Sequence, residues 1–145
     1  MRKVIRLFVA PWYLLGWLSH VYLGLVKPRI YAVFSETAII PGYADFWNSM
    51  VIPSITFFAL LLAAFEILVG CLLLSEGKWV KAGVVLSILF NLFLIQMGLG
   101  IPATGGWQDF LSNRLPNVIF LAIQLPLLWG RDEWLVPKSL RFGGK

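Results

Sequence analysis

Long stretches without formal charge constrain this chain most. Residues 7–26, 48–65 and 82–108 contain no Asp, Glu, Lys or Arg, and a shorter stretch of the same kind covers 115–130. About 20 apolar residues are enough for a helix to cross the hydrocarbon core of a bilayer. Inside lipid, backbone polar groups have no water to bind, so such a segment must pair them within itself as a helix. The sequence therefore predicts an all-α integral membrane protein.

Composition supports the same solvent. Hydrophobic residues make up 59% of the 145 residues, whereas soluble domains contain roughly 45–50% apolar residues. Seven tryptophans lie mostly near the ends of the apolar stretches, and indole rings favour the membrane–water interface. The net charge of +5 is spread over loops and termini. This distribution argues against nucleic-acid binding, which needs a clustered basic face.

We predict four membrane-spanning helices in a single domain that covers residues 1–145. They are expected at residues 7–26, 52–74, 79–99 and 111–129, as an antiparallel four-helix transmembrane bundle. Arg114 would lie at the start of the last span, where its long side chain can snorkel outward to the interface. Residues 131–145 are predicted to be a short polar tail.

The distribution of Lys and Arg predicts the orientation. Lysines and arginines concentrate in cytoplasmic loops of membrane proteins. If both termini are cytoplasmic, nine of the 12 cations lie inside: Arg2, Lys3, Arg6, Lys78, Lys81, Arg131, Lys138, Arg141 and Lys145. Lys27, Arg29 and Arg114 then lie outside. We therefore expect an N-in, C-in arrangement with a long outer segment between the first two spans.

That outer segment, residues 28–50, is rich in aromatic side chains. A loop of this length without recognisable structure is usually functional. Residues 44–50 are predicted to form a short amphipathic helix on the membrane surface. The alternative is that the segment simply plugs the mouth of the bundle, and its role stays open at this point.

A lone carboxylate, Glu66, interrupts the second span. It shares a three-to-four-residue spacing with Ala59, Ala63 and Gly70, so these residues lie on one face of the helix. Small residues allow helices to approach closely, which predicts that Glu66 faces the bundle interior. An acid at membrane depth is costly and is a functional-site candidate by default. Glu66 is our candidate catalytic residue, as a proton carrier; the alternative is a protonated side chain that only pins two helices together.

Other polar residues of the spans are the candidate ligand-binding residues. The rise of a helix per residue predicts an outer layer and an inner layer of polar side chains. The outer layer consists of His20, Gln96 and Asn117, and the inner layer of Glu66, Asn91 and Gln124. A neutral Glu66 hydrogen-bonded to Asn91 or Gln124 could pass a proton to a quinone-like ligand.

Two chemistries find no support in the sequence. The chain has one histidine and no acid beside it, so no metal site is predicted. It also has one cysteine, Cys71, which allows neither an internal disulfide nor a Cys-x-x-Cys relay.

The segment FEILVGCLLLSEGK at residues 65–78 places a carboxylate before a glycine, an apolar run and a glycine-bearing turn with a cation. A span rich in small residues follows. This pattern resembles the DoxX-like family of small four-span membrane proteins. Further similarities are a first span that carries Arg6, Gly16, His20, Gly24 and Lys27, and an outer Pro41-Gly42 pair before Trp47.

The resemblance implies a four-helix bundle in the inner membrane of a bacterial-type cell. Some DoxX-like proteins are subunits of thiosulfate:quinone oxidoreductase, and others are linked to redox-stress complexes. We therefore expect a membrane subunit of a quinone-linked redox system. It would bind a quinone-like or other lipophilic ligand, or a partner oxidoreductase, near Glu66, with self-association as a further expectation. Whether the chain is itself an enzyme is left open. The alternatives are a small proton-coupled carrier and a non-catalytic membrane scaffold.

Overall fold

The computed structural model describes residues 1–133 and 135. Over these residues the chain forms helices and their connections, with no strand. The long helices are α1 (Arg2–Val26), α4 (Ile55–Leu74), α5 (Lys78–Met97) and α7 (Leu115–Gln124). Helical turns on either side extend α7 to a stretch of Gly106–Leu128. These four helical stretches are long and apolar enough to cross a membrane, as the charge-free stretches predict.

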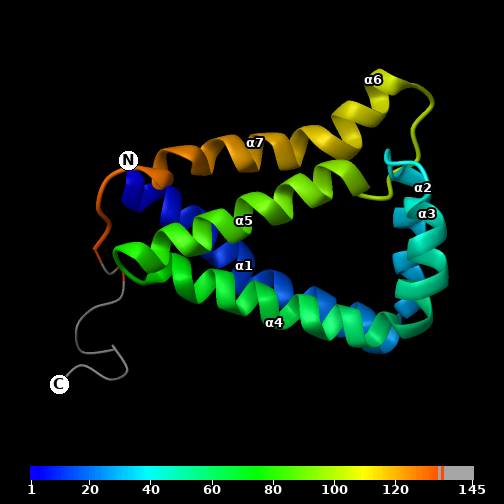
Figure 1. Ribbon diagram of the computed structural model, residues 1–145, viewed down its shortest axis with the longest axis horizontal. Coiled ribbons are helices and arrows are strands. Elements are labelled where there is room, and N and C mark those ends of the chain that lie inside the picture. The colour runs from blue at the N-terminus through cyan, green and yellow to red at the C-terminus, as the bar shows by residue number, and fades with distance from the viewer. Residues whose placement is uncertain (134, 136–145) are drawn as a thin grey trace.

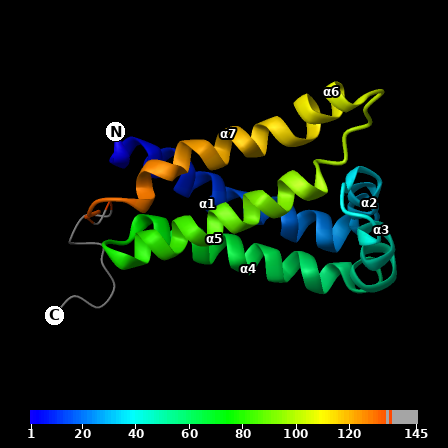
Figure 2. The ribbon, with the colours of Figure 1, turned by 45° about the horizontal axis from the view of Figure 1, so that its top comes forward.

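The long helices lie side by side and spread apart toward one end. The N-terminus, the α4–α5 turn and the end of α7 lie at one end of the molecule, whereas α2 (Phe34–Thr37), α3 (Tyr43–Phe46) and α6 (Gly106–Asp109) lie at the other (Figures 1 and 2). Helices α4 and α5 are close at their shared turn and diverge toward α3 (Figure 1). The elements at the open end therefore cover the space between the two diverging helices.

The outer segment is helical rather than an irregular loop. After α1 come a 3-10 helix, Pro28–Val33, then α2 and α3, and a π-helical turn, Trp47–Val51. Together α3 and this turn form the short helix expected over 44–50, and they run at a steep angle to α4 (Figure 1). Trp47 and Val51 are buried, so this helix packs over the end of the bundle.

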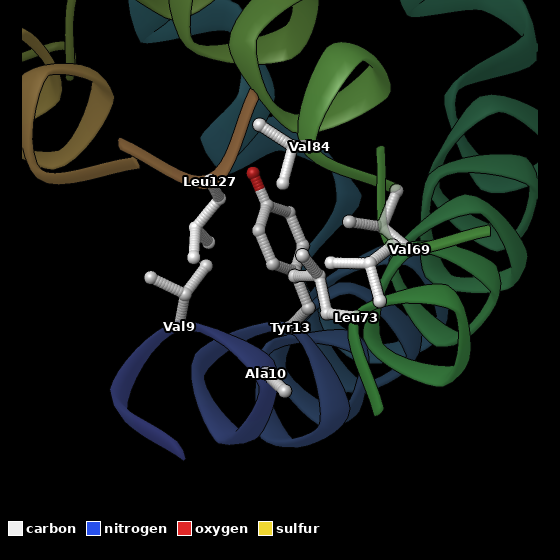
Figure 3. Close-up of a cluster of buried hydrophobic side chains, with 8 residues drawn as sticks. Val9, Ala10, Tyr13, Val69, Leu73, Val84 and Leu127 are labelled. Carbon is white, nitrogen blue, oxygen red and sulfur yellow. The ribbon is translucent and has the colours of Figure 1, made fainter. Parts of the chain in front are cut away.

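A hydrophobic core fills the end where the helices converge. It consists of Val9, Ala10, Tyr13, Val69, Leu73, Val80, Val84 and Leu127. Figure 3 shows Tyr13 surrounded by the apolar side chains of this cluster. The Tyr13 hydroxyl shares a 2.6 Å hydrogen bond with Ser87 Oγ, and Asn91 Nδ2 donates to the Tyr13 hydroxyl at 3.2 Å. Buried polar groups need such partners, so this network satisfies a tyrosine within an apolar core.

Small residues let α1 and α4 pack closely. A Cβ added at Gly24 would lie 2.6 Å from Ala59 Cβ, and one added at Gly70 would lie 2.6 Å from Leu14 Cγ. Ala59, Ala63, Glu66 and Gly70 are all buried. The predicted small-residue face of the second span is therefore the face that contacts the first span.

Arginines hold the converging end together. Arg6 is buried and donates to the carbonyls of Leu73 at 2.8 Å and Ser75 at 2.6 Å. These carbonyls end α4, where a helix has no partners of its own. Arg2 donates to Asp132, which is also buried. Within the predicted polar tail, Asp132 is thus bound to α1, whereas Arg131 and Glu133 are exposed; positions 138, 141 and 145 lie outside the described residues.

The start of the fourth span differs from the prediction. The helix begins at Gly106, before residue 111, and contains a π-helical turn, Phe110–Arg114. Arg114 is buried and does not snorkel outward. It donates to the carbonyls of Ile95 at 2.8 Å and Gln96 at 3.0 Å, to the Thr37 carbonyl and to Asp109. These acceptors, from the end of α5, from α2 and from α6, hold the guanidinium inside the bundle.

Candidate functional site

Glu66 lies inside the protein, as predicted. Glu66 is only 4% exposed, and it shares a buried face of α4 with Ala63 and Gly70. The carboxylate lies against Gly16 of α1: a Cβ added there would be 3.0 Å from Glu66 Oε1 and 3.1 Å from Oε2. Glycine at position 16 therefore makes the space into which the carboxylate fits.

His20 is the partner of Glu66. Its Nε2 lies 3.5 Å from Glu66 Oε1, and its Nδ1 shares a 2.7 Å hydrogen bond with the Tyr31 hydroxyl. Residues four apart share a helix face, so Gly16 and His20 lie on the same side of α1. The Glu66 carboxylate of α4 fits against Gly16 and thereby lies next to the imidazole of His20. The result is a chain of three groups, Glu66, His20 and Tyr31, from three different elements.

Tyr31 closes this chain from the outer segment. Burial, and in second place the Glu66 carboxylate, raises the pKa of Tyr31 to about 12, so the phenol stays neutral at physiological pH. Trp47 Nε1 donates to the Tyr31 carbonyl at 2.8 Å. Two short elements of the outer segment therefore fix the position of the hydroxyl that binds His20.

The predicted division into two polar layers is wrong, because His20 and Glu66 meet. Side chains in an α-helix lean toward the N-terminus of their own helix. The N-termini of α1 and α4 lie at opposite ends of the molecule (Figure 1), so the two side chains lean toward each other. This lean offsets the difference in depth that the rise per residue predicts.

The other amides take different places. Asn91 donates to Tyr13 and to the Ser87 carbonyl, and Gln124 Nε2 donates to the Phe120 carbonyl at 2.9 Å. The expected hydrogen bond from Asn91 or Gln124 to Glu66 is therefore not formed, because the two amide nitrogens donate to groups on or near their own helices; Gln124 Oε1 makes no hydrogen bond with any described residue. Gln96 has a buried Nε2 without a partner among the described residues, and it does not line the cavity around Glu66.

Asn117 is the second predicted residue that the structure brings to Glu66. Both residues line a cavity of about 290 Å³ between α1, α4, α5 and α7, together with His20, Tyr31 and Ser19. Its walls are otherwise mainly aromatic and aliphatic and include Trp12, Trp47, Phe90 and Leu94. A small-molecule site is usually a concave apolar surface that carries a few polar groups.

Two polar atoms at this cavity are unpaired. Glu66 Oε2 and Asn117 Nδ2 are buried and make no hydrogen bond with any described residue. Buried polar groups nearly always have partners, and an unmet one costs about 1–3 kcal/mol. An acceptor or acid on one side and an amide donor on the other thus suit a ligand with a polar head.

Comparisons with known proteins do not assign a function, so it has to be inferred from the geometry of this site. No family model, curated protein or solved structure matches the chain. The DoxX-like resemblance of residues 65–78 therefore stays a prediction. Within the described part of the chain, no group of three or more His, Cys, Asp or Glu side chains could hold a metal ion.

Sequence reasoning missed Gly16 and Tyr31 as parts of the site. Gly16 carries a recognisable signal, because it lies one helical turn before His20 on the small-residue face. Tyr31 carries none, since it lies in the outer segment among several aromatic residues that the sequence does not distinguish. Only the folded segment selects the tyrosine that reaches His20.

Proposed function

We propose that this protein is a membrane subunit of a quinone-linked redox system, and that it binds the polar head of a quinone-like molecule in the cavity at Glu66. The observation that carries this proposal is an apolar cavity lined by the pair of half-buried His20 and buried Glu66 and by the unpaired amide of Asn117. A quinone head fits these groups, because it offers two carbonyl acceptors when oxidised and two hydroxyl donors when reduced.

The pair can also serve the proton part of quinone chemistry. Reduction of a quinone takes up protons, and oxidation of the quinol releases them. A group that transfers a proton must lie within hydrogen-bond reach of the reacting oxygen. Glu66 would serve that task, because its Oε2 makes no hydrogen bond with any described residue, and His20, which lies between Glu66 Oε1 and the Tyr31 hydroxyl, would exchange the proton with it. The electrons would be exchanged with a partner oxidoreductase, which is the partner that the DoxX-like resemblance implies.

The proposal includes the membrane arrangement. We infer an antiparallel four-helix transmembrane bundle with both termini on the cytoplasmic side of a bacterial-type plasma membrane. Lys3 lies in the first turn of α1, Lys78 begins α5, and Arg131 follows the helical stretch that ends at Leu128. These three element ends lie together at the end of the molecule that carries the N-terminus (Figure 1). An excess of cations on one side is typical of cytoplasmic ends, and this supports the orientation.

Binding measurements on the Glu66→Gln variant test the proposal. The wild-type protein in mild detergent is titrated with a short-chain benzoquinone, and binding is followed by quenching of tryptophan fluorescence, since Trp12 and Trp47 line the cavity. We expect the variant to bind about tenfold or more weakly, which corresponds to roughly 1.4 kcal/mol. An amide cannot take the charge of the carboxylate or accept the proton of His20 in the same way.

Glu36→Gln is the matched control, because Glu36 is exposed in α2 and its loss should leave binding unchanged. Absence of quinone binding to the wild-type protein would refute the proposal. Transport of a solute by proteoliposomes that depends on Glu66 would favour the carrier instead. Intact quinone binding in both variants would reduce Glu66 to a structural residue.

A further inference from the structure

A second, apolar cavity adjoins the Glu66 site. It lies between the diverging helices α4 and α5 and has a volume of about 580 Å³. Leu61 and Phe65 of α4 and Leu86 and Leu89 of α5 form its two walls, and Tyr43 and Phe46 close its outer end. The Tyr43 hydroxyl is bound to Met97 Sδ at 3.4 Å. The lining therefore offers hydrocarbon and aromatic surface, and its one hydroxyl is already engaged.

The two cavities are adjacent and have part of their lining in common. Trp47, Leu62, Phe90 and Phe93 line both of them. On its other side the apolar cavity reaches the surface of the helices, where Leu61 is 55% exposed and Leu89 is 58% exposed. In a bilayer this surface faces lipid. A molecule that passes between these four shared side chains would reach from the lipid to the polar groups at Glu66.

We propose that this cavity binds the hydrocarbon tail of the same molecule whose polar head lies at Glu66 and Asn117, and that the ligand is therefore a long-tailed amphiphile that enters between α4 and α5. This inference rests on the proposed function and names the class of its ligand. Phe58 and Phe65 are seven positions apart along α4, and Leu86 and Phe93 are seven positions apart along α5, so each wall is about 10 Å long. A head alone does not need walls of that length.

Another cavity also adjoins the Glu66 site, and its lining differs. It has a volume of about 350 Å³ and lies between α1, α5 and α7. Its lining includes Tyr13, Asn91 and Asn117, so a hydrocarbon chain there would cover polar groups, which is unfavourable. The cavity between α4 and α5 is larger and lacks amide side chains. It is thus the better site for a tail, and the other one provides a matched control.

The test compares two ligands and two tryptophan variants. The ligands are a benzoquinone with a long alkyl tail and the same quinone without the tail, titrated calorimetrically into the protein in detergent. Leu89→Trp fills the cavity between α4 and α5 from its exposed wall, and Ile119→Trp does the same for the cavity beside α7, where Ile119 is 49% exposed. Lipid and detergent are about as apolar as the cavity, so the tail gains only van der Waals packing when it moves from them into the cavity.

We expect Leu89→Trp to weaken binding of the tailed quinone by about tenfold and to leave binding of the tail-less quinone unchanged. Ile119→Trp should affect neither ligand. Leu61→Trp, on the opposite wall, provides a second variant should Leu89→Trp fail to fold, as judged by thermal unfolding.

The outcomes separate the two proposals. If the wild-type protein binds both quinones, and Leu89→Trp and Leu61→Trp bind the two quinones equally well, the tail site is wrong and the head site stands. If the wild-type protein binds neither quinone, both are wrong. A change in oligomeric state on Leu89→Trp would assign the cavity between α4 and α5 to a second copy of the chain and refute the tail site.

Discussion

At the scale of single residues, Arg114 shows how a buried charge can be retained in a membrane protein. Its guanidinium donates to three main-chain carbonyls, at Thr37, Ile95 and Gln96, and to Asp109. Five N–H donors in a fixed planar arrangement suit such a set of acceptors, which a lysine could not satisfy. This single side chain thereby joins α2, the end of α5 and the start of the fourth span.

We predict that Arg114→Met destabilises the protein by about 2–3 kcal/mol. The variant keeps a long apolar stem but leaves buried carbonyls without donors, and each loss of this kind costs about 1–3 kcal/mol. Thermal unfolding in detergent measures the effect. Arg29→Met is the control, because Arg29 is exposed at the same end of the molecule. Equal stability of the two variants would show that Arg114 does not hold this end together.

Residues differ in how far the sequence predicts them. The burial of Glu66 follows from its small-residue face and from the cost of a charge in lipid, and both are local properties of one segment. Its contact with His20 depends on the packing of two helices whose side chains lean toward each other, and a depth count cannot supply that. Asp109 lies near Arg114 in sequence, but the three carbonyls that the guanidinium binds come from α2 and α5, and nothing near position 114 reveals them.

At the scale of elements, the contact of α1 with α4 places the site. Gly24 lies against Ala59, and Thr56 Oγ1 donates to the Gly24 carbonyl at 2.9 Å. Further along the same interface, Gly16 lies against Glu66. The separation of these two helices therefore sets the distance between His20 and the carboxylate.

We predict that Gly24→Ala destabilises the protein by about 1–3 kcal/mol, as overpacking of a close interface generally does. The added methyl group would lie 2.6 Å from Ala59 Cβ, so the helices must move apart. Urea or thermal unfolding in detergent gives the change, and quinone binding should weaken with it. Gly106→Ala is the control, since an added Cβ there meets nothing within 4 Å. An unaltered Gly24→Ala protein would contradict the close packing.

At the scale of the whole molecule, the orientation in the membrane can be measured. In a Cys71→Ala background, Glu76→Cys places a thiol in the α4–α5 turn and Ala103→Cys places one at the opposite end; both positions are exposed. We expect an impermeant thiol reagent to label position 103 in intact cells and position 76 only after permeabilisation. The reverse result would invert the N-in, C-in orientation.

The four long helices follow from the sequence because each depends on its own hydrophobic length and composition. The helical turns of the outer segment are predicted only over residues 44–50. Their burial depends on Trp47 and Val51 packing onto the bundle, and therefore on contacts between elements distant in sequence. For residues and for elements alike, the sequence does not predict how the helices pack against one another. The candidate site depends on that packing.

The bond between Arg2 and Asp132 has a consequence for biosynthesis. The two residues are 130 positions apart, so the first turn of α1 obtains its acceptors only when residues 126–132 have been made. Contacts of such long range form late. Until then the N-terminal arginine has to remain in water or among lipid headgroups. Residues 126–132 therefore complete the contacts of the first turn of α1.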